Sequence, residues 1–405
     1  MKTARGFSLV ELMIAIVLGL LVTDAMVAMF VSVRSASRTS EGVAGLSDSG
    51  RYALDSIEQV VRGAGNLACD SGSPLTVAGD SIPRIDNNLD TASGTPLLSN
   101  YDQPLSGYEA VGSAPGDTLT ISATPGALPT PGAADWLSTP TLGGNLDGAL
   151  VTPPIPAGQA APVGTPIAGS DVLVVHETLP GSRPAYITVD ATGATAFAIS
   201  SATTFTGGGA DQIAAISNCA QAEIFELGGF SSVTQTVTLG GSMPGNLTAS
   251  LNPNLPLPIG SQVDPIDVTV FYVGVGADGD GALFKYDGNG GALGGPYATN
   301  QELVPDVENM QILYGVETAL SSSTQTAAQY VTADKVAANS FTLDFTGVIS
   351  VKIALLVSSP PGAVPQGTAA PAAPQLLGTN WALATADNRI RKVYEQTMFL
   401  RNMSP

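Results

Sequence analysis

Gly6–Leu12, with the sequence GFSLVEL, opens a long apolar segment near the N-terminus. Residues 7–33 form one mostly apolar run, and a helix of that length reaches roughly 40 Å at about 1.5 Å per residue. A hydrocarbon core is about 30 Å thick, so the run predicts a single membrane-spanning helix. Lys2 and Arg5 precede it, and the positive-inside rule then keeps the N-terminus in the cytoplasm and sends the rest of the chain outward.

Glu11 lies within this apolar run. A carboxylate inside a membrane is costly and is expected to have a partner, so a plain membrane anchor does not explain it. An ordinary signal peptide does not explain it either, because such a peptide has a shorter apolar core that ends in a small-residue cleavage site.

Composition restricts the classes of function. The formal net charge is −19, and the only cations between residues 63 and 388 are Arg84, Arg183, Lys285, Lys335 and Lys352. With so few cations, this part of the chain cannot form the basic patch that binds the phosphate backbone, so no nucleic-acid partner is expected. The 46 Gly and 29 Pro are typical of a loop-rich extracellular domain.

Beyond the membrane the helix is expected to continue over residues 34–66. Apolar or small residues recur there at helical spacing, namely Val43, Leu46, Gly50, Ala53, Ile57 and Val60. Gly42, Gly45 and Gly50 each weaken a helix by about 1 kcal/mol relative to Ala, which predicts flexibility or local unwinding. Gly63, Gly65 and Asn66 predict its end.

The remainder, residues 67–405, predicts β-structure. Alternating apolar residues indicate strands at 348–358, 265–275 and 308–317, with further candidates at 117–123, 171–177, 223–227 and 185–189. No helical periodicity separates them, so the fold class is α+β: a long N-terminal helix packed on an antiparallel sheet. Residues 124–170 and 359–380 are rich in Pro and Gly and are expected to be long surface loops.

Cys69 and Cys219 are the only cysteines, without a CxxC motif or a nearby histidine, so a zinc site is not expected. In an oxidising compartment a disulfide between them is favoured. Two independently buried thiols are the alternative.

Two motifs suggest chemistry that the context does not support. GVGADG (274–279) has the spacing of a dinucleotide-binding loop, but DGALFKYDG continues as strand and turn, so a hairpin is favoured. Asp278, Asp280 and Asp287, with Asn289, offer oxygen ligands for calcium. They lack the EF-hand spacing, and ordinary turn chemistry is the favoured interpretation.

His176 is the only histidine and shares a strand face with Val172 and Val174. A buried strand histidine is favoured over a catalytic one, because no Ser/His/Asp or Cys/His set forms around it. The sequence therefore predicts no enzyme, no cofactor and no catalytic residue.

The short basic leader, the Gly6–Phe7 junction, Glu11 and the long apolar helix together resemble the start of a type IV prepilin. The resemblance implies that a membrane-embedded prepilin peptidase cuts between Gly6 and Phe7 and that Phe7 becomes N-methylated. It also implies that Glu11 pairs with the N-terminal amine of a neighbouring subunit in a filament. Residues 1–6 are then the leader and residues 7–33 the filament-core helix.

Asp24 is a second acidic residue of the run. It follows Phe7 by 17 residues, or roughly 26 Å of helix, and so reaches the outer membrane–water interface. A solvated interfacial carboxylate is the favoured interpretation. The alternative is a second inter-subunit pair, with Arg34 or Arg38 of a staggered neighbour.

The head resembles PilW-like minor pilins. The matching stretches are 49–69, 104–111, 170–176, 216–227, 302–317, 349–359 and 399–402. Both cysteines fall within them, which supports their pairing. The related J-type pseudopilins of type II secretion share several of these strands.

The resemblance implies a minor pilin that helps to initiate pilus assembly and sits in the pilus or at its tip. Its expected partners are the prepilin peptidase, other minor pilins, the major pilin and the inner-membrane assembly platform. Its expected location is the inner membrane, with a periplasmic head, and then the pilus on the cell surface. The alternatives are a pseudopilin of type II secretion and a tip-displayed adhesin.

Overall fold

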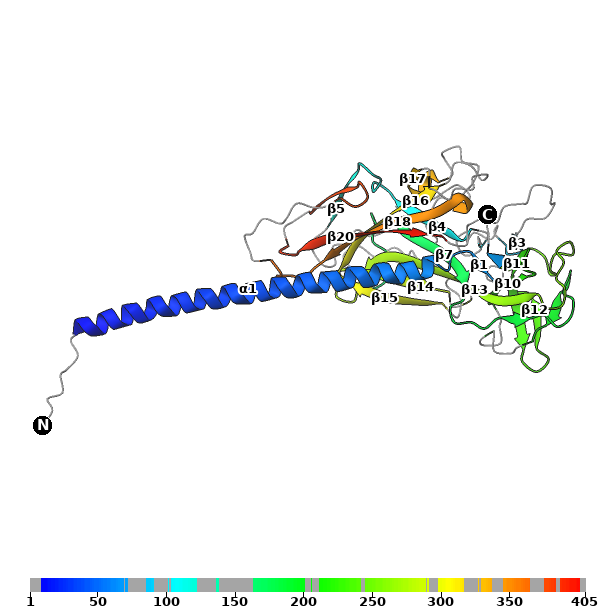
Figure 1. Ribbon diagram of the computed structural model, residues 1–405, viewed down its shortest axis with the longest axis horizontal. Coiled ribbons are helices and arrows are strands. Elements are labelled where there is room, and N and C mark those ends of the chain that lie inside the picture. Colours follow the sequence, from blue (N-terminus) through cyan, green and yellow to red (C-terminus); the bar gives the residue numbers. More distant parts are fainter. Residues whose placement is uncertain are drawn as a thin grey trace, which may run out of the picture.

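The computed structural model describes residues 9–68, 70–71, 85–90, 101, 103–121, 136–137, 163–200, 205, 211–241, 245–288, 290, 298–316, 327, 329–336, 345–364, 375–383 and 387–400. One long helix, α1 (Leu9–Val61), and a head built from strands make up this part of the chain. The N-terminal half of α1 projects from the head, and its C-terminal half lies along it (Figure 1).

The larger sheet runs through the whole head. Among the described residues its central order is β6-β4-β7-β13-β10-β11-β12-β9, with β14 and β8 on β13, β15 on β14 and β3 on β11. Its strands are β3 (Ile85–Asn87), β4 (Leu105–Ala110), β6 (Trp136–Leu137), β7 (Val172–Thr178), β8 (Ala185–Tyr186), β9 (Ala196–Ala198), β10 (Ile213–Ser217), β11 (Ala222–Ser231), β12 (Thr236–Leu239), β13 (Gln262–Val275), β14 (Gly281–Asp287) and β15 (Thr299–Pro305). Apart from the parallel pair β3–β11, the described pairs of this sheet are antiparallel.

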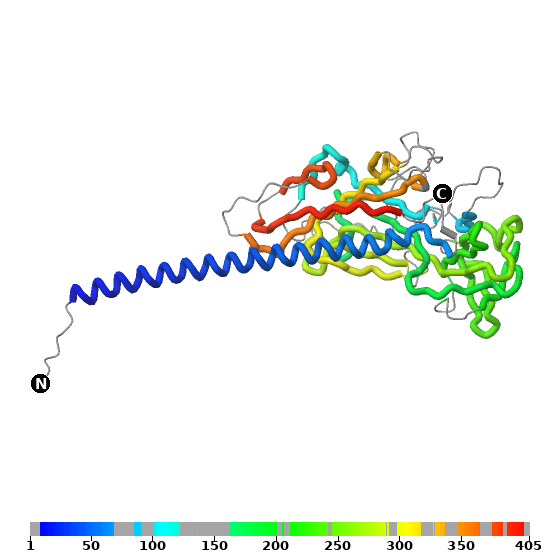
Figure 2. The backbone as a smooth tube through the Cα atoms, in the orientation of Figure 1, coloured from blue at the N-terminus to red at the C-terminus, as the bar shows by residue number. Residues whose placement is uncertain are grey.

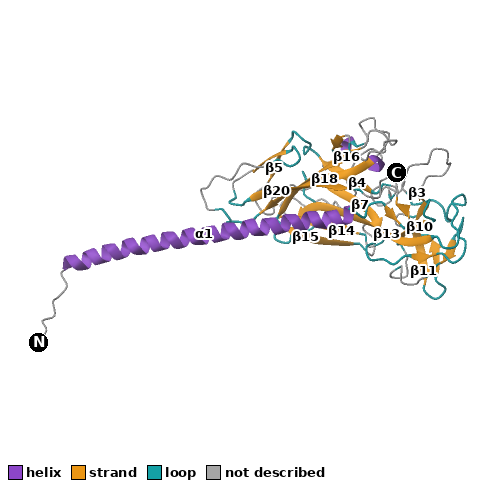
Figure 3. Cartoon of the chain, in the orientation of Figure 1, coloured by secondary structure: helices purple, strands orange, loops and turns teal. Residues whose placement is uncertain are grey.

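A second, antiparallel sheet has the order β17-β16-β18-β20 in the described part of the chain. Its strands are β16 (Val307–Val316), β17 (Gln329–Val331), β18 (Val348–Ser358) and β20 (Arg391–Phe399). Two small pairs complete the head: β1 (Asn66–Leu67) with β2 (Asp70–Ser71), and β5 (Thr118–Ile121) with β19 (Asn380–Leu383). The short 3₁₀ helices Ala333–Lys335 and Phe345–Gly347 lie near the second sheet (Figure 3).

The alternation of side chains along the central strands divides the core into layers. On β7, Leu173 and Val175 face the core that contains α1, whereas Val172 and Val174 face the opposite core with Trp136. Strand β18 alternates in the same way: its odd-numbered residues 351–357 join the α1 core, while Ala354 and Leu356 pack under Trp381. A residue-by-residue alternation of this kind follows from the period of two in a β-strand.

The predicted α+β class, with an N-terminal helix on an antiparallel sheet, is confirmed. The strand predicted at 348–358 has those bounds, and the one at 265–275 corresponds to most of β13. Strand 185–189 was predicted too long, since β8 contains only Ala185 and Tyr186. A short strand, β6, lies within the segment 124–170 that was expected to be loop, and its Trp136 is fully buried.

The predicted unwinding of the helix at its glycines is wrong for the described structure. α1 is continuous over 53 residues. Gly42 and Gly50 are buried on the face that meets the head, and a Cβ at Gly50 would overlap the ring of Tyr394. Gly50 therefore allows close approach between α1 and β20, and Gly42 lies close to Ser359 and Ala363 in the segment after β18. Val43, which was assigned to the buried stripe, is 45% exposed, and Gly42 takes its place.

Candidate functional site

The N-terminal half of α1 is an apolar surface without a partner in the described head. Its residues from Leu9 to Val33 are exposed, and its best 18-residue window has a mean hydropathy of 2.5 with no residue buried. By length and composition this is the one described helix that is able to cross a membrane. Figure 2 shows it standing clear of the head.

Glu11 lies in the first turn of α1, where the unsatisfied N–H groups of a helix favour negative charge. Asp24 lies farther along the same exposed segment. Gly6 and Phe7 are outside the described residues. The cleavage, the methylation and the roles of both carboxylates remain predictions.

The C-terminal half of α1 is fastened to the head by polar bonds as well as by packing. The Thr39 hydroxyl donates a hydrogen bond to the Ala363 carbonyl at 2.6 Å, and Gln396 on β20 donates one to the Glu58 carboxylate at 2.7 Å. Leu46, Ile57 and other side chains of α1 enter the core between the two sheets. These contacts fix the direction in which the exposed half of α1 leaves the head.

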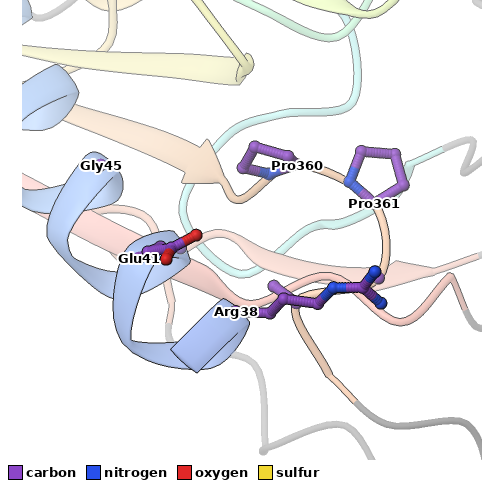
Figure 4. A pocket seen from close by; sticks show the side chains of 8 residues that line it. Arg38, Glu41, Gly45, Pro360 and Pro361 are labelled. Carbon is purple, nitrogen blue, oxygen red and sulfur yellow. The ribbon is translucent and has the colours of Figure 1, made fainter. Parts of the chain in front are cut away.

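A notch of about 450 Å³ opens where α1 leaves the head. It lies between α1 and the segment after β18, and its lining consists of Arg38, Glu41, Gly42, Gly45 and residues 360–363. Figure 4 shows the Arg38 side chain extending from α1 toward the segment that carries Pro360 and Pro361. No ion pair joins Arg38 to another described residue, and its side chain is exposed.

The predicted calcium ligands do not all come together. Asp278 and Asp280, in the β13–β14 hairpin, are grouped with Asp306, which follows β15. Asp287 lies at the other end of β14, where Lys285 binds it at 2.5 Å. Asn289 is outside the described residues.

The buried guanidinium of Arg389 forms ion pairs within the Asp278–Asp280–Asp306 group. Arg389, 5% exposed, contacts Asp280 at 2.5 Å and Asp306 at 3.3 Å. Burial raises the pKa of Asp306 to about 6, although the charge of Arg389 opposes that rise. Arg389 thus supplies the positive charge that a cation would otherwise bring, and ordinary turn and ion-pair chemistry accounts for the hairpin. The GVGADG stretch forms this β13–β14 hairpin, as predicted.

His176 is buried in β7, where its Nδ1 lies 2.8 Å from the Gln103 carbonyl and its ring packs against Tyr101 at 4.4 Å. This matches the predicted strand histidine. Cys219 is not a free thiol. Because Cys69 lies outside the described residues, the Cys69–Cys219 disulfide stays a prediction.

A pair of buried carboxylates that the sequence pattern did not predict lies between the two sheets. Asp171 accepts hydrogen bonds from the N–H groups of Ala110 at 2.9 Å and Ile312 at 2.8 Å, and the Ser113 hydroxyl lies 3.3 Å from both Asp171 and Glu109. Burial raises the pKa of Asp171 to about 7, and burial together with the charge of Asp171 raises that of Glu109 to about 10. Glu109 in β4 and Asp171 before β7 are each an isolated acidic residue in the sequence. Nothing in the sequence pattern therefore indicated that they pair.

Comparison with protein-family models gives two matches. Residues 1–23 match the prokaryotic N-terminal methylation motif, and residues 270–402 match Type IV Pilus-assembly protein W, PilW. The second match begins within β13 and extends past the end of β20. It includes Arg389 and the Asp278–Asp280–Asp306 group. The resembling stretches between residues 49 and 227 lie outside it. Searches of curated proteins and of solved structures found no match.

Both matched models describe structural parts of pili and not enzymes. The methylation motif and the exposed apolar helix together support anchoring in a membrane. The expected PilW-like resemblance is thereby confirmed for the C-terminal third of the chain, and the expected prepilin resemblance is confirmed for residues 1–23.

Proposed function

We propose that this chain, a type IV pilus-related protein with a prepilin motif and a PilW domain, is a minor pilin that helps to initiate pilus assembly. The observation that carries the proposal is the division of α1 into two halves. One half is buried in the head, and the other is apolar, exposed and preceded by the methylation motif. A helix of this kind is suited first to a membrane and then to the core of a helical filament.

The proposed sequence of events begins in the inner membrane. The N-terminus lies in the cytoplasm and the head in the periplasm, as Lys2 and Arg5 indicate. The prepilin peptidase cuts between Gly6 and Phe7 and methylates Phe7. The assembly platform then moves the subunit into the pilus, at or near its tip, beside other minor pilins and the major pilin.

Glu11 is proposed to set the docking depth of the subunit. Its carboxylate would pair with the N-terminal amine of a neighbouring helix. An unpaired charge in a low-dielectric core costs several kcal/mol, so one axial position is preferred over all others.

The notch extends this proposal to Asp24 and Arg38. Of the two cations considered for Asp24, Arg38 lines the notch. Asp24 and Arg38 are 14 residues apart, or about 21 Å along the helix. A neighbouring pilin helix displaced by that length would bring its own acidic residue to the notch.

The priming role is tested by deleting the gene in its host and counting sheared surface pili, with and without the retraction motor. Loss of pili that is partly restored without retraction is the expected result, because a primer acts at initiation and not at elongation. Normal pili in the deletion strain would rule out priming, and secretion and adhesion assays would then examine the alternatives of a type II secretion pseudopilin and a tip adhesin.

The notch is tested separately by Arg38→Glu. We expect less of the variant subunit in sheared pili than of the wild type, because the substitution places a carboxylate opposite an acidic neighbour. The matched control is Arg51→Glu, at an exposed arginine of α1 outside the notch. Equal incorporation of the two variants would show that the notch is not a contact surface.

A further inference from the structure

A second cavity lies at the opposite end of the head from the projecting half of α1. It has a volume of about 300 Å³, and its lining comes from β3, β11 and the segment 247–253. Figure 1 shows β3 and β11 at the end of the head that is far from the N-terminus of α1. In a subunit anchored by α1, this cavity faces away from the membrane.

The floor of the cavity is polar and built by strand register. Strand β3 runs parallel to β11 with Asp86 opposite Glu223, so the two carboxylates lie side by side. Asn88 follows two residues after Asp86. Glu223 and Asn88 are 1% and 5% exposed, which makes both of them fixed parts of the fold and not mobile surface groups.

The segment 247–253 closes over this floor through hydrogen bonds. The Asn252 N–H donates to Glu223 at 2.8 Å, and the Asn252 amide donates to Asp86 at 2.5 Å. The Thr248 N–H donates to the side-chain Oδ1 of Asn88 at 2.9 Å. The cavity is therefore pre-formed, as ligand sites usually are.

The lining has more acceptors than donors. The Asn88 NH₂ group has two hydrogens but faces three oxygens, each at 3.4 Å: Oε1 of Glu223 and the carbonyls of Thr248 and Ser250. The one hydroxyl hydrogen of Thr248 lies between the Asn88 oxygen at 2.9 Å and the Ser250 carbonyl at 2.7 Å. A ligand that brings hydroxyl donors would satisfy the remaining acceptors.

The groups that line the cavity restrict the class of ligand that it can bind. A bare calcium ion takes six to eight oxygens at about 2.3–2.6 Å, but here N–H groups already point at both carboxylates and would repel a cation. An anion would meet two carboxylates. At the rim, Leu247 is 60% exposed and Pro253 is exposed, so an apolar face is available beside the polar floor.

We propose that this cavity binds a neutral sugar residue, whose hydroxyls donate to Asp86 and the carbonyls of Thr248 and Ser250 while its C–H face lies on Leu247 and Pro253. This site is separate from α1 and the notch. The proposal does not rest on the priming role proposed above.

The experiment uses the full chain in a detergent without a sugar headgroup, because a glycosidic detergent would compete for the cavity. Saturation-transfer NMR with free glucose, galactose, mannose and N-acetylglucosamine, each in excess, measures binding. We expect at least one of them to bind the wild type. Asp86→Asn is expected to weaken binding by about tenfold or more, because it removes a charge-assisted acceptor. The control Asp190→Asn, at an exposed aspartate outside the cavity, should leave binding unchanged.

Leu247→Arg provides a second variant that does not disturb the buried floor. Its side chain starts from an exposed position and is expected to fill the cavity beside the two carboxylates and abolish sugar binding. Absence of binding by all four sugars would overturn the proposal. So would sugar signals that persist in both variants, or binding of calcium alone that Asp86→Asn abolishes. Pilus counts are not a readout here, so failure of this proposal and failure of the priming role are distinguishable.

Discussion

Gly45 and Gly50 lie little more than one turn apart on α1, yet their surroundings differ. A Cβ at Gly45 would meet no atom within 4 Å, whereas one at Gly50 would overlap the Tyr394 ring. The Tyr394 ring is itself held in place, with the Lys392 ammonium 4.7 Å from its centroid. The same residue type therefore has opposite roles at the two positions: a weak point of the helix at Gly45 and a required close contact at Gly50.

The corresponding substitutions should change stability in opposite directions. Gly50→Ala is expected to lower the free energy of unfolding by about 1–3 kcal/mol, because overpacking outweighs the gain in helix propensity. Gly45→Ala is expected to raise it by up to about 1 kcal/mol. Urea unfolding of the full chain in detergent measures both. If the two variants shifted in the same direction, the close contact between α1 and β20 would not be the reason for Gly50.

At the scale of elements, β20 shows how a buried charge network fixes an edge strand. The Arg391 guanidinium bonds to Glu308 on β16 at 2.6 and 2.8 Å and to Asp387 at 2.8 Å. Its side chain is only 4% exposed. The network joins β20 to β16, two strands that lie on opposite sides of β18.

Removal of this guanidinium should cost far more than removal of its neighbour. Arg391→Ala is expected to destabilise the head by about 3–5 kcal/mol, because Glu308 loses its cation and Asp387 loses its hydrogen-bonded one. Lys392→Ala, at an exposed side chain of the same strand, is expected to cost about 1 kcal/mol or less. Thermal unfolding of the two variants provides the comparison. Similar losses would mean that the Arg391 network does not hold the strand.

The elements that were predictable from sequence are those whose pattern is local. Strand β18 alternates without interruption, so its bounds and the face that joins the α1 core followed from the letters alone, whereas the burial of its other face did not. The role of Gly50 was misjudged because helix propensity is local, whereas its contact with Tyr394 joins residues more than 300 positions apart. The Asp86–Glu223 cavity was missed for the same reason, since it depends on the register of two distant strands.

At the scale of the molecule, the head contains many buried carboxyls for a chain with a net charge of −19. Burial raises the pKa of Asp171, Glu177 and Glu223 each to about 7. Asp387 differs: burial alone would raise its pKa, but hydrogen bonds and charge from Arg391 and Arg389 lower it overall. More of these carboxyls have a raised pKa than a lowered one. The carboxyls with a raised pKa therefore determine how the stability of the fold changes with pH.

The sign of that response follows from linkage. In the unfolded chain these carboxyls have ordinary pKa values near 4, so between about pH 4 and pH 7 the folded state binds more protons than the unfolded state. The free energy of unfolding should therefore fall as the pH rises through this window. The stability that Asp387 contributes behaves oppositely and is lost only in stronger acid, below its ordinary range.

The substitution Glu109→Gln tests how much one buried carboxyl contributes to this pH dependence of stability. Burial and the charge of Asp171 raise the pKa of Glu109 to about 10, so from about pH 5 to pH 7 it contributes close to one proton to the difference between the folded and unfolded states. The slope of unfolding free energy against pH should become shallower in the variant by about 1.4 kcal/mol per pH unit. Glu395→Gln, at a half-exposed carboxylate on β20, is the matched control for removal of one carboxylate from the head. Urea titrations of the full chain at pH 5, 6 and 7 measure the slopes, and an unchanged slope for Glu109→Gln would show that this carboxyl is ionised in the folded head.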